Sequence, residues 1–186
     1  MNNSKPRNRP VFWRNHDGVA AVEFALIFPV LLLIFVNVVA LFDGLRASRL
    51  IARSAAVSVD LVTRFQGNDF TSDDFDEIIE VSKSIAGPYA ENTNFTVVVT
   101  SIINVFDQDD DLTVAWSASD PVDNELADAD LDEFDLPDLA QGDTLILVEV
   151  RANYTPILTS EIVVSFTLDD YQVRRPRFQT AIDAPD

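Results

Sequence analysis

Cysteine is absent from this chain of 186 residues, and histidine occurs once, at position 16. Disulfides and thiolate metal sites are therefore excluded. Because His16 lies in the N-terminal tail, neither a histidine base nor a histidine-bound metal is available to the rest of the chain. Gly-rich phosphate loops and nucleophile elbows are missing as well. The sequence thus predicts a protein that is not an enzyme and holds no cofactor or metal. A membrane-anchored hydrolase that uses two of the many carboxylates is the weakest alternative.

Basic residues are scarce in the second part of the chain. Residues 1–66 hold eight Lys/Arg and four Asp/Glu, a balance of +4, whereas residues 67–186 hold five Lys/Arg and 27 Asp/Glu, a balance of −22. So acidic a region is repelled by nucleic acid and by anionic lipid. We therefore expect no nucleic-acid partner.

One long run lacks charge altogether. It extends from Phe24 to Phe42, 19 residues that include Pro29 and Asn37. As a helix it spans roughly 28 Å, close to the hydrocarbon thickness of a bilayer. A secretory signal has a shorter apolar region, and a buried core helix of this length needs a larger domain around it. The run predicts a single transmembrane helix in contact with membrane lipid.

Basic residues flank this run on both sides and bear on its orientation. Four precede it and three follow it closely: Lys5, Arg7, Arg9 and Arg14, then Arg46, Arg49 and Arg53. Together with the free amine, this is a weak indication of a cytoplasmic N-terminus. Acidic residues count little in that rule, so the C-terminal part can still be exported.

A glycine and a glutamate stand where the apolar run begins. Gly18 is followed by Val19, and Glu23 and Phe24 come at the fifth and sixth positions after the glycine. A carboxylate this near the bilayer is unfavourable without a partner. Cleavage after Gly18 would create one, because the new amine of Val19 is a cation that a neighbouring Glu23 can neutralise. The alternative is that Glu23 only interacts with the dipole of its own helix.

These residues resemble a known family. The segment from Gly18 to Arg64, about a quarter of the chain, looks like the signature of TadE-like pilus assembly proteins of the tight-adherence (Tad) machinery. The resemblance rests on Gly18, Glu23-Phe24-Ala25-Leu26, Pro29 and an Ala/Ser/Arg-rich continuation. It implies cleavage after Gly18 by a prepilin peptidase, a new N-terminus at Val19 and an assembly role for Glu23. Phe24 in place of tyrosine, with a long extra domain, fits a minor pilin or pseudopilin.

The resemblance also implies partners and a location. The partners are other Tad pilins and pseudopilins, the prepilin peptidase and the inner-membrane assembly platform. The expected location is the bacterial inner membrane, with the C-terminal domain in the periplasm, and incorporation into the surface pilus stays open. The competing hypothesis is an unprocessed single-pass anchor that presents an acidic domain for calcium or a protein.

Three regions are expected: a leader at 1–18, a transmembrane and amphipathic helix at 19–66, and an acidic domain at 67–186. The first helix should continue to about Phe65 and stop at Gly67-Asn68, and a second should run from Thr71 to Gly87-Pro88. Four alternating runs predict strands: Phe95 to Val105; Leu112, Val114 and Trp116; Ile146 to Tyr154; and Ile162 to Leu168. The fold class is α+β, with a mainly antiparallel four-stranded sheet packed on the helix, as in pilins.

The helix that follows the membrane run should be amphipathic. At 100° per residue, one stripe contains Arg46, Arg49, Arg53, Asp60 and Arg64, and the opposite face contains Ile51, Ala55, Ser58 and Val62.

An acidic insert at 107–143 contains 14 Asp/Glu and no Lys or Arg. Two D-x-D-x-D runs, at Asp107 to Asp111 and Asp128 to Asp132, lack the Gly and Glu of an EF-hand. We expect a solvated, mobile loop after a hairpin connection at 107–111, with a different calcium site as an alternative. Spaced apolar residues (Leu131, Phe134, Leu136, Leu139) also suit docking of a basic partner. The basic cluster Arg174-Arg175-Pro176-Arg177 either pairs with the acidic insert of the same chain or of a neighbouring chain, or forms a solvated tail end.

Overall fold

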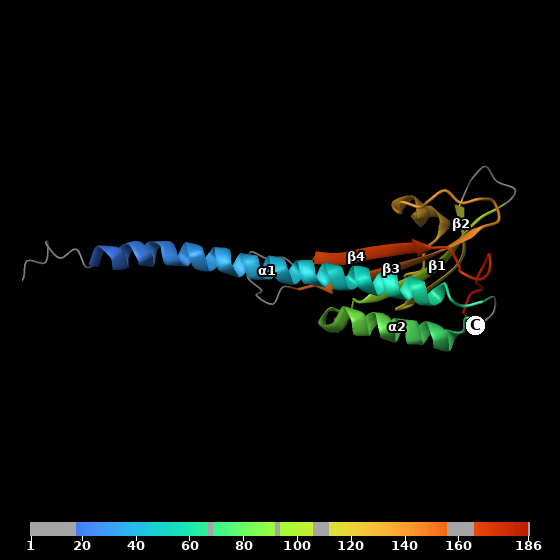
Figure 1. The fold of residues 1–186 in the computed structure, drawn as a ribbon, viewed down its shortest axis with the longest axis horizontal. Helices are drawn as coiled ribbons and strands as arrows, with labels where there is room; N and C mark the ends of the chain where they lie inside the picture. The colour runs from blue at the N-terminus through green and yellow to red at the C-terminus, as the bar shows by residue number, and fades with distance from the viewer. Residues whose placement is uncertain (1–17, 67–68, 92–93, 106–111, 156–165, 186) are drawn as a thin grey trace, which may run out of the picture. The chain divides into compact units, whose positions relative to one another are not determined.

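The structure is a computed structural model that describes residues 18–66, 69–91, 94–105, 112–155 and 166–185 (Figure 1). The chain divides into two compact units, Met1–Leu41 and Phe42–Asp186. Each unit is described by itself below. Helix α1, Val19–Val62, is continuous in sequence through the division.

The first unit is the N-terminal part of α1. Its most apolar window of 18 residues has a mean hydropathy of 2.9, and none of that window is buried. Within the described residues, α1 is the helix that is long and apolar enough to cross a membrane. Side chains such as Leu26 and Phe35, 75% and 65% exposed, need a lipid environment rather than water. These features fit a single-pass membrane protein, as the sequence predicts.

The second unit begins with the remainder of α1, which ends at Val62 and not near Phe65. The expected stop at 67–68 lies outside the described residues. Helix α2, Ser72–Ala86, starts as predicted, because the Thr71 side chain accepts a hydrogen bond from the Asp74 backbone N–H and Asp74 reaches back to the Thr71 N–H. Gly87, with φ of 60°, ends α2. A short 3-10 helix, η3, Gly87–Ala90, follows.

Four strands form one sheet: β1 Thr96–Asn104, β2 Leu112–Asp120, β3 Thr144–Tyr154 and β4 Phe166–Arg174. Their order is β2-β1-β3-β4, and every neighbouring pair is antiparallel. This confirms the α+β fold and the β1–β2 hairpin, whose connection at 107–111 lies outside the described residues. The fourth strand begins at Phe166; the first part of its predicted run, 162–165, also lies outside them.

A β-bulge at Ala115 changes the face of the sheet to which the side chains of β2 point. Trp116 is paired with Ser101 and Val114 with Ile102, so Ala115 has no partner in β1. Trp116 therefore packs toward the helices, whereas Val114 packs on the opposite face. The prediction that Leu112, Val114 and Trp116 share one face is wrong, because an extra residue reverses the alternation.

Helices α1 and α2 cover one face of the sheet (Figure 1). The predicted apolar face of α1 is confirmed: Ile51, Ala55, Ser58 and Val62 are at most 1% exposed. This face packs with Val99 and Val148 of the central strands. Each large aliphatic side chain buried here stabilises the fold by roughly 1.5–3 kcal/mol, so the sheet needs α1 as its cover.

The chain between β2 and β3 covers the other face of the sheet. A 3-10 helix, η4, Asp128–Glu133, lies within it. Three leucines of this segment are buried against Val98, Ile102, Leu145 and Leu147 of the sheet: Leu126, Leu131 and Leu139. Phe134 and Leu136 pack on the same cluster. The prediction of a mobile loop is therefore wrong for residues 112–143, and its apolar side chains are occupied by their own sheet instead of being free for a basic partner.

Candidate functional site

The N-terminal candidate site is the start of α1. The helix begins at Val19, immediately after Gly18, and Glu23 lies about one turn further on. The Glu23 side chain is exposed, and no hydrogen bond or ion pair joins it to another described residue. Phe24 packs on Phe28 with 5.5 Å between ring centroids. Among the described residues, the carboxylate is therefore not engaged by another side chain.

The polar side chain of the apolar run has a local hydrogen-bond partner. Asn37 donates from Nδ2 to the Leu33 carbonyl oxygen at 2.7 Å, one turn back on the same helix. Pro29 lies inside the helix without ending it. Membrane helices accommodate such residues when the side chain or backbone finds a local partner.

A second candidate site lies in the other unit, where α1 emerges from the apolar run. Asp43 follows Phe42 directly, and two phenols donate to its carboxylate. The Tyr89 hydroxyl donates to Oδ1 at 2.8 Å, and the Tyr154 hydroxyl donates to Oδ2 at 2.8 Å. We call these three residues the Asp43–tyrosine cluster. It ties η3 and the end of β3 to the helix at its first charged residue after the membrane run.

Close packing accompanies these bonds. A Cβ atom at Gly44 would lie 3.7 Å from the Tyr154 ring, an ordinary van der Waals distance, so the ring lies directly against the helix at this residue. Burial, reinforced by the Asp43 carboxylate, raises the pKa of Tyr154 to about 12. The pKa of Tyr89 is raised for the same reasons. Both phenols therefore remain neutral donors at physiological pH.

Asp60 anchors the C-terminal basic cluster to α1. Arg174 donates to Asp60 Oδ1 at 2.9 Å, and Arg64 and Arg177 donate to the same carboxylate. The hydrogen bond from Arg64 and the charges of Arg177 and Arg174 hold the pKa of Asp60 below its usual range. In addition, the Arg177 backbone N–H donates to the Thr63 carbonyl at 3.1 Å.

The arginines of the basic cluster thus form ion pairs with two different parts of the chain. Arg175 pairs with Asp143, at the end of the acidic insert, at 3.0 Å. Pairing of the cluster with the insert is confirmed for Arg175, whereas Arg174 and Arg177 bind α1. These three arginine side chains are also about half exposed, so they are solvated while they form these ion pairs.

In the second D-x-D-x-D run, Asp128 to Asp132, two carboxylates accept hydrogen bonds from backbone N–H groups. Asp128 accepts from the Val114 N–H at 2.6 Å, and Asp130 accepts from the Ala127 N–H at 2.8 Å. Across the described parts of the chain, no three His, Asp or Glu side chains converge as metal ligands. The run at 107–111 lies outside the described residues.

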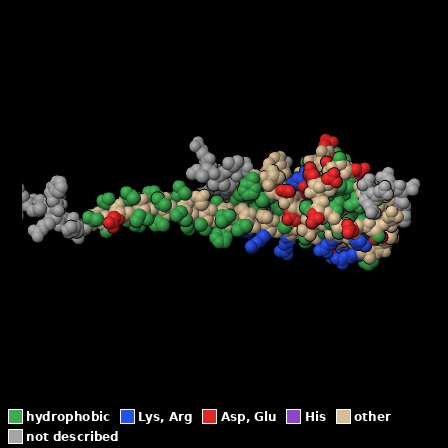
Figure 2. Space-filling model, turned by 90° about the horizontal axis from the view of Figure 1, so that it is seen from above, with side chains coloured by type: hydrophobic (Ala, Val, Ile, Leu, Met, Phe, Trp, Pro, Cys, Tyr) green, Lys and Arg blue, Asp and Glu red, His purple; other side chains and the backbone are tan. Residues whose placement is uncertain are grey.

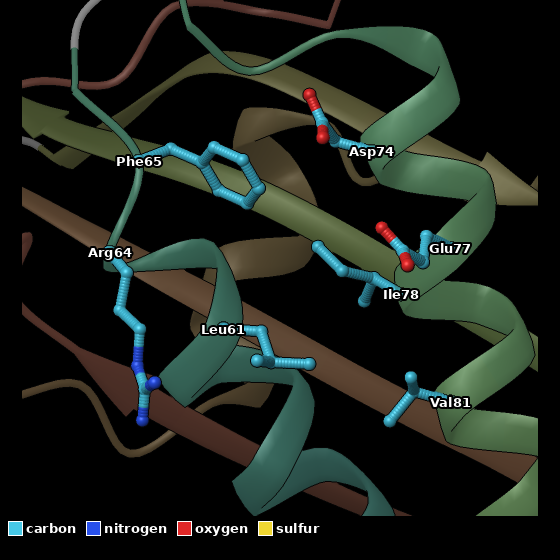
Figure 3. A pocket seen from close by; sticks show the side chains of 7 residues that line it. All are labelled: Leu61, Arg64, Phe65, Asp74, Glu77, Ile78 and Val81. Atoms are coloured by element: carbon cyan, nitrogen blue, oxygen red, sulfur yellow. The ribbon is translucent and has the colours of Figure 1, made fainter.

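A groove of about 320 Å³ lies between α1 and α2 (Figure 3). Its floor is apolar and is formed by Leu61, Phe65, Ile78 and Val81, with Arg64, Asp74 and Glu77 around it. Asp74 is occupied by the cap of α2. The groove is thus lined mainly by apolar side chains, as is typical of a surface where another side chain packs.

An apolar helix that continues into a small α+β domain fits a single-pass membrane protein whose head is packed on the same helix. Residues 18–56, about a fifth of the chain, match the family described as TadE-like protein. This match confirms the resemblance for that segment, and it begins at Gly18. Neither a curated protein nor a solved structure matches the chain.

Two features were not predicted from the sequence. One is the Asp43–tyrosine cluster, and the other is the packing of the acidic insert on one face of the sheet. Asp43 is the first charged residue after the apolar run, which could have marked it as a candidate. Its two partners could not be predicted, because they lie 46 and 111 residues away in the sequence. The signal for the cover was β1 itself, whose residues 96–102 are buried on both faces and therefore need a layer on each side.

Proposed function

We propose that this chain is a non-enzymatic minor pilin or pseudopilin that serves assembly of a Tad-type pilus. The observation that carries the proposal is the TadE-like match at residues 18–56, which begins at Gly18 and includes Glu23 and the whole apolar run. The continuation of α1 under the sheet adds support, because it joins a membrane helix to a head as assembly of a filament requires.

In this proposal the N-terminus is cytoplasmic and the head is periplasmic. A prepilin peptidase cleaves after Gly18, so that Val19 gains a free amine. The amine and the Glu23 carboxylate of one chain then meet their counterparts on parallel neighbours, which are other Tad pilins or pseudopilins. The inner-membrane assembly platform is a further partner. A charge pair counts for more in such apolar surroundings than in water.

Intact mass of the native membrane protein tests the processing step. We expect a chain that begins at Val19 when the prepilin peptidase of the same system is present, and one that begins at Met1 when it is absent. Gly18→Leu should block cleavage, because a bulky side chain obstructs access to the backbone. Ala25→Leu, which adds the same bulk within the apolar run, should leave cleavage unchanged.

A native chain that keeps Met1 would contradict the processed-pilin proposal. That result would favour the unprocessed anchor that presents an acidic domain.

A further inference from the structure

An arginine stripe on α1 forms no ion pair with the described residues, although Arg46 interacts electrostatically with Tyr89. It consists of Arg46, Arg49 and Arg53, which are exposed on the face opposite the buried Ile51 and Ala55. Figure 2 shows basic side chains projecting in a row from one side of the helix. Further along the same face, Asp60 and Arg64 are paired, but no ion pair joins the stripe to any described residue. Such unpaired cations are unexpected in a chain of net charge −18.

The position of the stripe argues against lipid as its main ligand. At about 1.5 Å per residue, Arg46, Arg49 and Arg53 lie roughly 6, 10 and 16 Å beyond Phe42, the end of the apolar run. The headgroup layer on one side of a bilayer is only about 5–8 Å thick. Lipid phosphates therefore reach Arg46, whereas Arg49 and Arg53 project where a protein partner is needed.

Helix α2 presents a stripe of opposite charge. This acidic stripe consists of Asp73, Glu77 and Glu80, which are exposed and form no ion pair with the described residues. Helix α2 runs antiparallel to α1, because Ser82 bonds Ser54 and Ser58 while Ile78 and Asp74 lie near Leu61 and Phe65. Read in the direction of α1, the acidic residues are spaced by three and then four positions, and the arginines have the same spacing.

We propose that the arginine stripe of one copy binds the acidic stripe of a second copy of this chain. In parallel copies Arg46 faces Glu80, Arg49 faces Glu77, and Arg53 faces Asp73. Each exposed pair is weak alone, but three pairs in register select one arrangement. Screening by physiological salt removes much of the repulsion between more distant acidic groups and leaves the contacts in place.

The proposal fixes the relative height of the two copies. Since Ser82 is level with Ser54 and Ser58, the centre of the acidic stripe lies roughly 18 Å further along the α1 axis than the centre of the arginine stripe. Copies at equal depth in a membrane cannot bring the stripes together, whereas copies staggered along a filament can. The contact joins different surfaces and does not close on itself, which suits a filament. This inference rests on the proposed assembly function.

Reciprocal charge exchange provides the first test. Arg49→Glu with Arg53→Glu, or Asp73→Arg with Glu77→Arg, should each lower the amount of this protein in sheared pili at least about tenfold. Combining all four changes should restore it. The control pair Glu91→Arg with Asp138→Arg changes two exposed acids outside the stripes and should have no effect. Failure of the combined variant to restore the protein would overturn the proposal.

Chemical crosslinking provides the second test and uses the absence of natural cysteine. Two differently tagged copies are expressed together, one with Arg49→Cys and the other with Glu77→Cys. A short bismaleimide should link the two tags in pili, and should do so at least fivefold less when the second copy carries Asp123→Cys. It should also do so less in membranes of cells that lack the assembly platform.

The outcomes separate this inference from the proposed function. Normal pili in a strain without this chain would contradict the proposed function. If pili require the chain but the two tags are not linked, or are linked equally without the platform, the inference alone is overturned. It is also overturned if Arg49→Glu with Arg53→Glu impairs only binding of the full chain to phosphatidylglycerol vesicles, because lipid is then the ligand.

Discussion

The Tyr154 hydroxyl donates a hydrogen bond of 2.8 Å to the Asp43 carboxylate, which lies 111 residues earlier in the chain. Tyr89 donates to the other oxygen of the same carboxylate. The last residue of β3 and the η3 turn are thereby fixed to α1 one residue beyond the apolar run.

Tyr154→Phe should therefore destabilise the fragment 42–186 by about 1–2 kcal/mol, since it removes a hydrogen bond to a charged group but keeps the ring. Urea denaturation measures this loss. In an Asp43→Asn background the same substitution should cost less, because the charged acceptor is already gone. Equal costs in the two backgrounds would show that the Tyr154 hydroxyl stabilises the head independently of Asp43.

The same bond predicts a pH dependence. Burial and the Asp43 carboxylate raise the pKa of Tyr154 to about 12, so the neutral phenol is favoured in the folded head. Its stabilising contribution is complete below the ordinary pKa of about 10 and is lost as the pH rises toward 12. In an ultraviolet titration, Asp43→Asn should move the latest tyrosine transition toward 10. A transition unchanged by Asp43→Asn would attribute the shift to burial alone.

The acidic insert should behave as part of the core. Leu131, 6% exposed, packs on the face of the sheet formed by Val98 and Leu147. Leu131→Ala should lower the free energy of unfolding of fragment 42–186 by about 2–4 kcal/mol. The adjacent exposed change Asp132→Asn should stay within about 0.5 kcal/mol. A mobile loop would instead make both changes neutral, and denaturation midpoints distinguish the two results.

Local signals in the sequence predicted most of the fold, and contacts between distant residues account for what was missed. The cap at Thr71, the stop at Gly87 and the alternation of the strands each depend on neighbouring residues, and both α-helices and all four strands were predicted near their observed places. The two 3-10 helices, η3 and η4, were not predicted. The bulge at Ala115 could not be predicted, because a bulge is defined by pairing with β1. Charge density concealed the role of Leu126, Leu131 and Leu139, whose spacing is irregular because they lie in loops and a 3-10 turn.

Asp60 should make stability depend on pH in the acid range. Its pKa is lowered by Arg64, Arg177 and Arg174, so its contribution is complete above about pH 4 and is lost as the pH falls through the lowered pKa. Asp60→Asn should lower the melting temperature at pH 7, and the difference from the unmodified fragment should shrink toward pH 2. Asp123→Asn, an exposed control, should show no such trend. A difference that is constant with pH would exclude a role for the Asp60 charge.

Glu23 should act in assembly and not in folding. It lies in the first unit, exposed and without a described partner, whereas the core of the head is formed by residues of the second unit. Glu23→Ala should therefore leave protein level, membrane insertion and cleavage before Val19 intact. It should reduce pilus formation and co-purification with other pilins, because the amine of a neighbouring chain loses its counter-charge in an apolar environment.

Glu23→Asp distinguishes the effect of the negative charge from the effect of side-chain length. It keeps the carboxylate but shortens the side chain, so assembly should be intermediate between that of the native protein and that of Glu23→Ala. Electron microscopy counts the pili, and immunoblotting with intact mass verifies that each variant is present and processed. Normal pili with Glu23→Ala would remove the main physical support for the pilin proposal. Degradation of the variant would show instead that the carboxylate is needed for insertion or folding.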